Sequence, residues 1–207
     1  AIDKSSSVDH VFPESKLYCK APHYEPGGGG VNVARAIRKL GGESALLYPA
    51  GGLTGHRLKD LLDEEGIYQR PVLIQGMTRE SLVVLEESTG QQFRFGMPGP
   101  ALSNEECERC LQELSTISPQ PDYLVASGSL PPGVPFDFYA RVARIGKDHG
   151  ARVIIDTSGE ALKQALLEGV YLIKPNYREF RELVGREMKE EWQITAEAVK
   201  LVESGRC

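Results

Sequence analysis

Short apolar runs alternate with amphipathic stretches along most of the chain. Apolar residues three and four positions apart predict helices over 31–40, 55–65, 104–116, 136–149, 160–168, 177–183 and 195–202. Brief apolar runs bounded by turn residues predict strands over 44–48, 72–74, 122–126, 152–156 and 171–174. Repeated strand–helix units of this kind favour an α/β fold, in which helices cover a mostly parallel sheet.

Two segments do not follow this alternation of strands and helices. Lys16–Lys20 and Arg79–Phe95 alternate apolar with polar residues, and Ser88-Thr89-Gly90 carries a hairpin signal within the second segment. We expect these segments to form a small antiparallel sheet that projects from the main body. One face of such a sheet packs against other apolar groups, while the other face is exposed to solvent.

The length and charge of the chain exclude some classes of protein function. The chain has 207 residues, enough for one large domain or a domain with a small appendage. Its 24 basic and 29 acidic residues give a net charge of −5, which argues against a nucleic-acid-binding protein. No apolar run has the length of a membrane span, and the first residues do not form a signal peptide. We therefore expect a soluble cytoplasmic protein.

The cysteines do not indicate a metal site. Cys107 and Cys110 form a C-x-x-C pair inside the helix predicted over 104–116, and no second ligand pair lies nearby. We interpret them as ordinary helix positions in a reducing compartment.

A run of four glycines is the first candidate site. Gly27–Gly30 lead directly into the predicted helix, which carries Asn32 near its start. Glycines allow close backbone approaches, and a helix N-terminus offers unpaired N–H groups, so the motif suits a polyhydroxylated or phosphorylated small molecule. A flexible turn before a helix is the alternative. The spacing matches neither a P-loop nor the dinucleotide fingerprint, which disfavours an NAD-dependent oxidoreductase.

Three predicted strands end in polar loops. These loops are 127–133, 156–160 and 174–179. Because ligands bind at the carboxyl ends of strands in α/β sheets, we expect the loops to contribute to one shared site. For Asp156 itself, capping of the following helix is the favoured interpretation.

Taken together, these motifs resemble one known family. Segments 25–36, 127–133, 156–161 and 174–179 are similar, in order and spacing, to motifs of the ribokinase-like carbohydrate kinases, phosphofructokinase B branch. The resemblance extends over nearly the whole chain. It implies a three-layer α/β/α core with a small β-sheet lid, formed here by segments near 14–24 and 76–98. It also implies transfer of the ATP γ-phosphoryl group, with Mg²⁺, to a sugar-phosphate hydroxyl.

The glycine run suggests the acceptor. Its four-glycine form is most similar to that of the minor bacterial 6-phosphofructokinases, which implies fructose 6-phosphate as acceptor and fructose 1,6-bisphosphate as product. 1-Phosphofructokinases and tagatose-6-phosphate kinases more often carry a Lys within this run, and both stay open as alternatives.

The resemblance assigns roles to particular residues. It implies that the sugar phosphate contacts residues of the glycine motif, the presumed lid and the strand-end loop, namely Asp3, Gly28, Gly29, Asn32, Arg79 and Ser129. Lys174 and Asn176 would lie near the ATP phosphates, and Glu179, in the N-x-x-E motif, would order Mg²⁺ and its waters. Arg79 could instead be an exposed strand charge.

The resemblance also implies a homodimer through the lid. Lys16, on a lid strand, would reach the neighbouring subunit's nucleotide, and Val84 would pack outward at the interface. Close relatives tend to carry a basic residue where this chain has Tyr18, which puts the phosphate contact across the interface in doubt.

Residues Ala1–Asp3 resemble the end of a strand whose beginning is missing, and Glu203–Cys207 resemble a helix end that leads into another strand. These ends lead us to expect an incomplete kinase domain over 1–207. The family's Gly-Ala-Gly-Asp motif, which supplies the catalytic base and an anion hole, is not present and would lie beyond Cys207. Because general-base catalysis alone contributes on the order of 10²–10⁴-fold, we expect the 207-residue polypeptide to be almost inactive. The alternatives are the ordered part of an active kinase and a truncated, non-catalytic fragment that binds sugar weakly.

Overall fold

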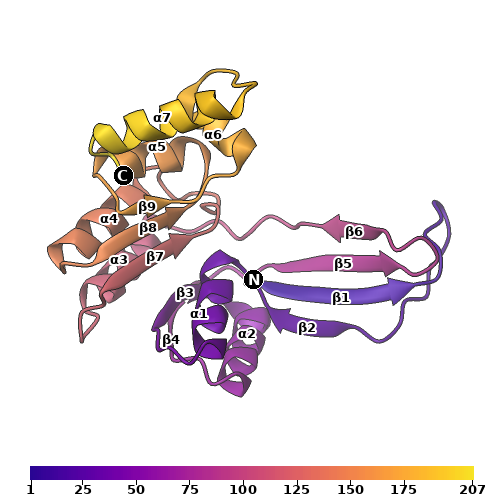
Figure 1. Ribbon diagram of the computed structural model, residues 1–207. Coiled ribbons are helices and arrows are strands. Elements are labelled where there is room, and N and C mark those ends of the chain that lie inside the picture. Colours follow the sequence, from indigo (N-terminus) through magenta and orange to yellow (C-terminus); the bar gives the residue numbers. More distant parts are fainter. The chain divides into compact units, whose positions relative to one another are not determined.

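The computed structural model describes all residues, 1–207, and they form two compact units (Figure 1). Unit 1 comprises Ala1–Leu102 and unit 2 comprises Ser103–Cys207. No helix in either unit is both long and apolar enough to cross a membrane.

A four-stranded sheet extends away from the rest of unit 1 (Figure 1). Its strands, in the order β2-β1-β5-β6, are His23–Pro26, Ile2–Val8, Glu80–Glu86 and Gln92–Phe95. The central strands β1 and β5 run parallel, and each outer strand is antiparallel to its neighbour. The sheet is therefore mixed.

Parts of this sheet differ from the sequence prediction. The expected antiparallel sheet is wrong at its centre, because β1 and β5 pair in parallel. Lys16–Lys20 forms no strand and lies in the connection between β1 and β2. Strand β1, expected to end near Asp3, continues to Val8 through the polar run Lys4–Ser7. Pairing with β5 along the whole run, and with β2 at Lys4 and Ser5, holds it extended, although it lacks any apolar alternation.

The two faces of the sheet differ in polarity. Residues paired directly across neighbouring strands share a face. One face carries mainly polar side chains, among them Asp3, Ser5, Glu25, Ser81 and Arg94. The opposite face carries mainly apolar ones, among them Leu82, Val84, Phe93 and Phe95.

The expected outward position of Val84 is wrong. Only 8% of Val84 is exposed within this single chain, whereas Phe95, on the same face, is 47% exposed. The strand alternation gives the correct face but does not show that other parts of unit 1 cover Val84.

The remainder of unit 1 packs two helices with a second, smaller sheet. Helices α1 (Gly29–Lys39) and α2 (Gly52–Glu64) accompany the parallel strands β3 (Leu46–Ala50) and β4 (Gln69–Leu73). The buried core of this unit consists of Ile2, Val31, Ala34, Leu46, Tyr48, Ala50, Leu58, Leu61, Leu62 and Ile67. Ile2 belongs to β1, so the four-stranded sheet begins inside the core of the unit.

Unit 2 is built on a three-stranded parallel sheet, β7-β8-β9. Its strands are Tyr123–Ser127, Arg152–Asp156 and Leu172–Ile173. Its helices are α3 (Asn104–Ser115), α4 (Phe138–Asp148), α5 (Gly159–Leu167), α6 (Tyr177–Val184) and α7 (Glu191–Glu203). Helix α4 lies close to the sheet at Gly146, where a Cβ would meet Leu124 and Val153 at 2.7 Å. The repeated strand–helix units predicted from the sequence are confirmed here to within a few residues at their ends.

The C-x-x-C pair lies in the interior of unit 2. Cys107 and Cys110 are buried on α3, beside the buried Leu111 and Leu114, and both thiols are free. Burial raises the pKa of Cys110 to about 11, so this thiol stays protonated at neutral pH. These are packing positions of an amphipathic helix.

Candidate substrate and nucleotide sites

The glycine turn of unit 1 wraps closely around the start of β1. The Gly27 N–H donates to the carbonyl of Ala1 at 3.0 Å. A Cβ on Gly27 would lie 2.3 Å from Asp3 Oδ2, so only glycine leaves room for that carboxylate. Gly28 has φ of 112°, a conformation that L side chains rarely adopt, and it is the N-cap of α1. The turn is therefore a fixed structure, not a flexible linker.

The sequence did not single out the glycine with the tightest surroundings. The resemblance selected Gly28 and Gly29, while Gly27 is the one that contacts the Asp3 side chain. A Cβ on Gly30 would meet nothing within 4 Å, so packing within the chain does not require a glycine there. Nothing in a run of identical residues distinguishes these cases.

Asp3 lies at the centre of this region. It is the second residue of β1, half-buried, and its carboxylate makes no hydrogen bond or ion pair within the chain. Asn32 is exposed on the first turn of α1, and its N–H donates to the carbonyl of Gly28 at 2.9 Å. A free carboxylate, a free amide and a tight glycine turn thus lie together.

Arg79 reaches the same end of the sheet. It immediately precedes β5, and its carbonyl accepts the Ile2 N–H at 3.0 Å. Its exposed guanidinium has only a long contact, 3.4 Å, with the carbonyl of Met97. Because β1 and β5 are parallel, both strands begin at this end, where β2 finishes.

Buried Thr78 fixes the backbone beside Arg79. Its hydroxyl accepts the Gly51 N–H at 3.1 Å, and its carbonyl accepts the Thr54 hydroxyl at 2.6 Å. A Cβ on Gly51 would lie 2.1 Å from the carbonyl oxygen of Gly76. Sequence reasoning missed this second glycine turn. Its signal was the Gly51-Gly52 pair directly after an apolar strand.

Lys16 lies elsewhere in unit 1. It belongs to the 9–22 connection at the far end of the sheet (Figure 1). The five steps of β1 from Asp3 to Val8 span roughly 17 Å. Lys16 is exposed, with its ammonium 5.1 Å from the ring centre of Tyr18. The structure therefore does not bring Lys16 to Asp3 within one chain.

In unit 2, the three strands end in a connected polar cluster. Asp156, at the end of β8, accepts the Ser127 hydroxyl at 3.0 Å and lies 3.2 Å from the Lys174 ammonium. Its carbonyl also accepts the Gly128 N–H at 3.0 Å. The expected capping role of Asp156 is wrong, because Ser158 is the N-cap of α5 and no side chain caps that helix. The neighbouring strand ends engage Asp156 instead.

The turn that carries Ser129 is held from two sides. The Gly128 carbonyl accepts the buried Tyr139 hydroxyl at 2.9 Å, while its N–H binds β8 as described above. Ser129 itself is exposed. Burial raises the pKa of Tyr139 to about 12, so its hydroxyl remains a donor at physiological pH.

Asn176 and Glu179 form a capping box at the start of α6. Asn176 Oδ1 accepts the Glu179 N–H at 3.0 Å, and Glu179 Oε2 accepts the Asn176 N–H at 2.8 Å. This reciprocal pair explains part of the N-x-x-E motif by helix stability alone. The other Glu179 oxygen and the Asn176 amide nitrogen make no contact within the chain.

The donor set near Glu179 suits a water-mediated cation. No group of three or more Asp, Glu, His or Cys side chains in residues 1–207 is arranged so that it could hold a metal ion. Mg²⁺ keeps several waters and commonly binds through one or two carboxylates together with substrate phosphates. The single free carboxylate oxygen of Glu179 fits that mode and does not fit an all-protein cage.

Comparison with known proteins decides the family. The model of the pfkB family carbohydrate kinases matches residues 1–206. The chain belongs to this family. The resemblance stated from the sequence motifs is thereby confirmed.

Individual members of the pfkB family are similar over the whole chain. One is the ATP-dependent 6-phosphofructokinase isozyme 2 of Mycobacterium tuberculosis, 48% identical over 207 residues. The chain spans 61% of that relative's length. Phosphofructokinase-2 from Escherichia coli, solved in complex with fructose-6-phosphate, has a TM-score of 0.94 and 41% identity, with 100% of this chain and 68% of that chain covered.

A more distant structure shows the fold alone. Arabidopsis thaliana ribokinase has a TM-score of 0.65 at 21% identity, with 99% of this chain and 66% of that chain covered. The predicted ribokinase-like α/β fold is therefore confirmed.

Proposed function

We propose that the full-length protein containing this chain is an ATP-dependent kinase that phosphorylates fructose 6-phosphate to fructose 1,6-bisphosphate in the cytoplasm. The observation that carries the proposal is the unpaired Asp3 carboxylate, held by Gly27 beside Asn32 and Arg79. A carboxylate and an amide bind sugar hydroxyls, and a guanidinium binds a phosphate. The names of the relatives support fructose 6-phosphate as the acceptor.

Each group has a part in positioning the reactants. Asp3 and Asn32 orient the sugar hydroxyls, Gly28 and Gly29 let the backbone close around the sugar, and Arg79 holds its phosphate. In unit 2, Ser129 contacts the sugar, and Lys174 and Asn176 bind the ATP phosphates. Glu179 holds Mg²⁺ through water. The metal neutralises phosphate charge, which phosphoryl transfer requires more than covalent help from the protein.

The acceptor preference tests this assignment. Full-length protein is assayed with ATP and Mg²⁺, and kcat/KM is compared for fructose 6-phosphate, fructose 1-phosphate and tagatose 6-phosphate. We expect a clear preference for fructose 6-phosphate, since no lysine stands in Gly27–Gly30 at the sugar pocket. A preference for fructose 1-phosphate would overturn the assignment in favour of a 1-phosphofructokinase.

The 207-residue polypeptide is a separate case. Without the family's Gly-Ala-Gly-Asp motif we expect it to be nearly inactive, although it retains both candidate sites. An intact mass near 22.7 kDa for the natural protein would favour a truncated product, and a substantially larger mass would favour the full kinase.

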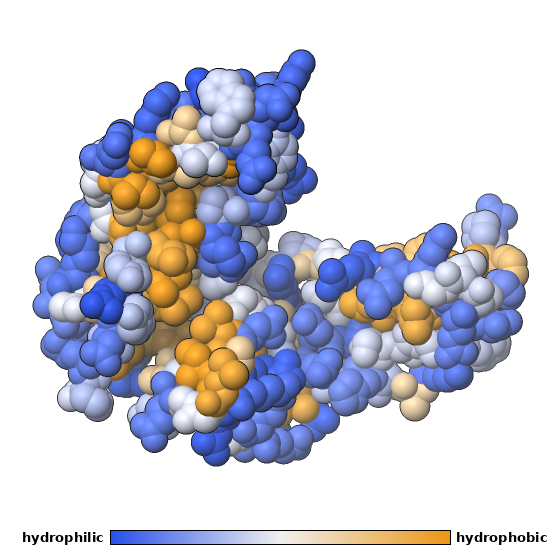
Figure 2. All heavy atoms as spheres, in the orientation of Figure 1, coloured by the Kyte–Doolittle hydropathy of each residue, from blue (hydrophilic) through white to orange (hydrophobic).

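We also propose a homodimer through the four-stranded sheet, which acts as a lid. The apolar face of the sheet supports this, because Phe95 stays 47% exposed there. Figure 2 shows apolar residues, in orange, on the surface of the projecting sheet. A second copy on this face would cover it and would bring its Lys16 toward the partner's nucleotide.

Sedimentation tests the dimer. Phe95→Asp is expected to dissociate it and to raise the KM for sugar phosphate, whereas Phe136→Asp, at an exposed position in unit 2, is expected to leave it dimeric. A wild-type protein that is monomeric at micromolar concentration and fully active would rule the dimer out.

A further inference from the structure

Two adjacent glutamates at the end of β5 hold both ends of the 9–22 connection. Glu86 is the last residue of β5, and Glu87 is the first residue of the turn that follows it. Glu86 binds the beginning of the connection and Glu87 binds its end. Neither residue belongs to the sites described above.

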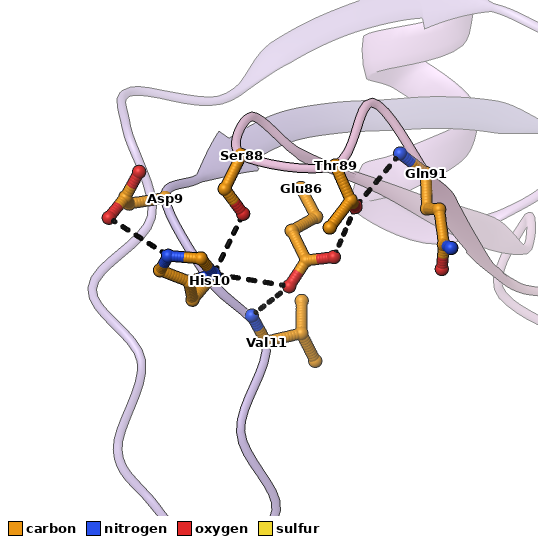
Figure 3. Close-up of polar contacts among 7 residues, drawn as sticks. All are labelled: Asp9, His10, Val11, Glu86, Ser88, Thr89 and Gln91. Atoms are coloured by element: carbon orange, nitrogen blue, oxygen red, sulfur yellow. Dashed lines mark hydrogen bonds and ion pairs between the residues drawn. The ribbon is translucent and has the colours of Figure 1, made fainter.

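Glu86 engages the beginning of the connection through a buried carboxylate. Only 7% of Glu86 is exposed, and its Oε1 accepts the Val11 N–H at 2.7 Å (Figure 3). Its other oxygen accepts a short hydrogen bond from the Thr89 hydroxyl. These two hydrogen bonds hold the pKa of Glu86 below its usual value, and the bond from Thr89 has the larger effect. A buried carboxylate needs such partners, so the loop and the turn are tied to each other through it.

His10 extends this contact to the neighbouring turn. Its Nδ1 lies 2.7 Å from the Ser88 hydroxyl and 3.8 Å from Glu86 Oε1, and its Nε2 lies 3.8 Å from Asp9 (Figure 3). The Ser88 N–H also donates to the carbonyl of Asp9 at 3.2 Å. The beginning of the connection is therefore attached by backbone and side chain together.

Glu87 engages the other end. Its carboxylate accepts the Lys20 ammonium at 2.6 Å and the Ser7 hydroxyl at 2.7 Å. The Lys20 N–H donates to the carbonyl of Ser7 at 2.9 Å, and the Ser6 hydroxyl donates to the carbonyl of Lys20 at 2.6 Å. Between these two attachments lies Lys16, which has no contact except that with Tyr18.

We infer that Glu86 and Glu87 are positioning residues, which hold the 9–22 connection so that Lys16 stands where the reaction uses it. A long connection without secondary structure samples many conformations unless something fixes it. The two carboxylates fix the connection at both ends, so that only the segment around Lys16 can change its conformation. The inference rests on the proposed role of Lys16 toward the nucleotide of the partner subunit.

The first arm of the test measures the connection directly. Full-length protein is digested briefly with trypsin, and the rate of cleavage after Lys16 is followed by mass spectrometry. Loss of a hydrogen bond to a charged group is worth a factor of about ten or more in local opening, so Glu86→Leu and Glu87→Leu are each expected to speed this cleavage about tenfold. Glu86→Gln, which keeps an acceptor for Val11, is expected to restore most of the resistance. Glu14→Leu, an exposed glutamate in the same connection with no partner, is the control and is expected to have little effect.

The second arm measures the contribution to the reaction. Lys16→Ala is expected to raise the KM for ATP about tenfold with kcat little changed, the loss of one charge-assisted hydrogen bond. Glu86→Leu and Glu87→Leu are expected to raise the same KM, and to raise it no further when combined with Lys16→Ala. That non-additivity separates a positioning role from general destabilisation.

Each combination of cleavage rate and KM either supports or overturns the inference. Faster cleavage together with a KM effect that disappears in the Lys16→Ala background supports the inference. Unchanged cleavage in both glutamate variants overturns it, and so does faster cleavage with an unchanged KM. A wild-type protein that phosphorylates no sugar phosphate removes the proposed function, and with it the role in the reaction. The cleavage arm then still decides whether the glutamates hold the connection.

Discussion

The two candidate regions hold their polar groups in opposite ways. In unit 1, Asp3 makes no hydrogen bond or ion pair, and Arg79 has one long contact of 3.4 Å. In unit 2, Asp156 is paired with Lys174, and Asn176 with Glu179. Unpaired polar groups form their hydrogen bonds only when a ligand binds. Polar groups that are already paired are held rigidly before binding, and only their remaining donor and acceptor atoms can contact a ligand. Unit 1 thus suits recognition, and unit 2 suits a fixed platform for phosphates.

The largest expected effect comes from the unpaired carboxylate. Asp3→Asn in the full-length protein keeps the shape but removes the charge, so we expect the KM for fructose 6-phosphate to rise about 10- to 100-fold, since hydrogen bonds to charged groups contribute about 1.5–3 kcal/mol. Folding stability should hardly change, because Asp3 has no partner in the free chain. Steady-state kinetics and thermal unfolding check both points. Asp60→Asn, an exposed carboxylate on α2, is the control. A large fall in stability would show that Asp3 is a structural residue.

The glycine beside Asp3 gives the next effect. Gly27→Ala would place a methyl group 2.3 Å from the carboxylate, so we expect a loss of about 1–3 kcal/mol in the free energy of unfolding, together with weaker sugar binding. Gly30→Ala is the matched variant. Its Cβ would meet open space in the first turn of a helix, and we expect it to stabilise the fold by up to about 1 kcal/mol. Urea unfolding of both variants measures the difference. Equal effects would contradict the close approach seen at Gly27.

Substitutions of Glu179 can distinguish its role in capping helix α6 from its proposed role in binding Mg²⁺. Glutamine serves in a capping box as glutamate does, so Glu179→Gln should leave stability nearly unchanged while it lowers kcat and raises the Mg²⁺ requirement. Glu179→Ala should also remove the cap, at a cost of about 1 kcal/mol. Activity titrated with Mg²⁺ and urea unfolding distinguish the two roles. If Glu179→Gln keeps the wild-type Mg²⁺ dependence, the residue serves only the helix.

The smallest effect is expected at Asp156. Its ion pair with Lys174 is solvent-exposed on the lysine side, and such pairs contribute about 0–1 kcal/mol. Asp156→Asn keeps an acceptor for the Ser127 hydroxyl, so we expect a stability change under about 1 kcal/mol and a weakening of ATP binding severalfold as Lys174 loses its orientation. Calorimetry with a non-hydrolysable ATP analogue checks the binding. A change of several kcal/mol would mean that the cluster is part of the core.

The sequence was most informative where structure is local. Helical periodicity predicted α3 and α5, and the strand Arg152–Asp156 was predicted at its observed bounds, because these elements follow from spacing alone. The Ser-rich strand β1 was missed beyond Asp3, because pairing with β2 and β5 holds it. The partner of Asp156 could not be predicted either, since Lys174 reaches it from the loop that follows β9. Motifs identified the regions of the sites, and tertiary contacts decided which atoms remain free.

The parallel pair of β1 and β5 has a consequence for the order of folding. Ile2 pairs with Glu80, so 78 positions separate the partners, and α1, β3, α2 and β4 all lie between them. Closing so long a loop is slow compared with forming local helices, because the chain entropy is lost before the contacts compensate for it. On a ribosome, β1 emerges before β5 and stays unpaired on that side until β5 has been made. During this interval the future sheet exposes strand edges, so this part of the chain is the one that most needs protection from aggregation while it is being synthesised.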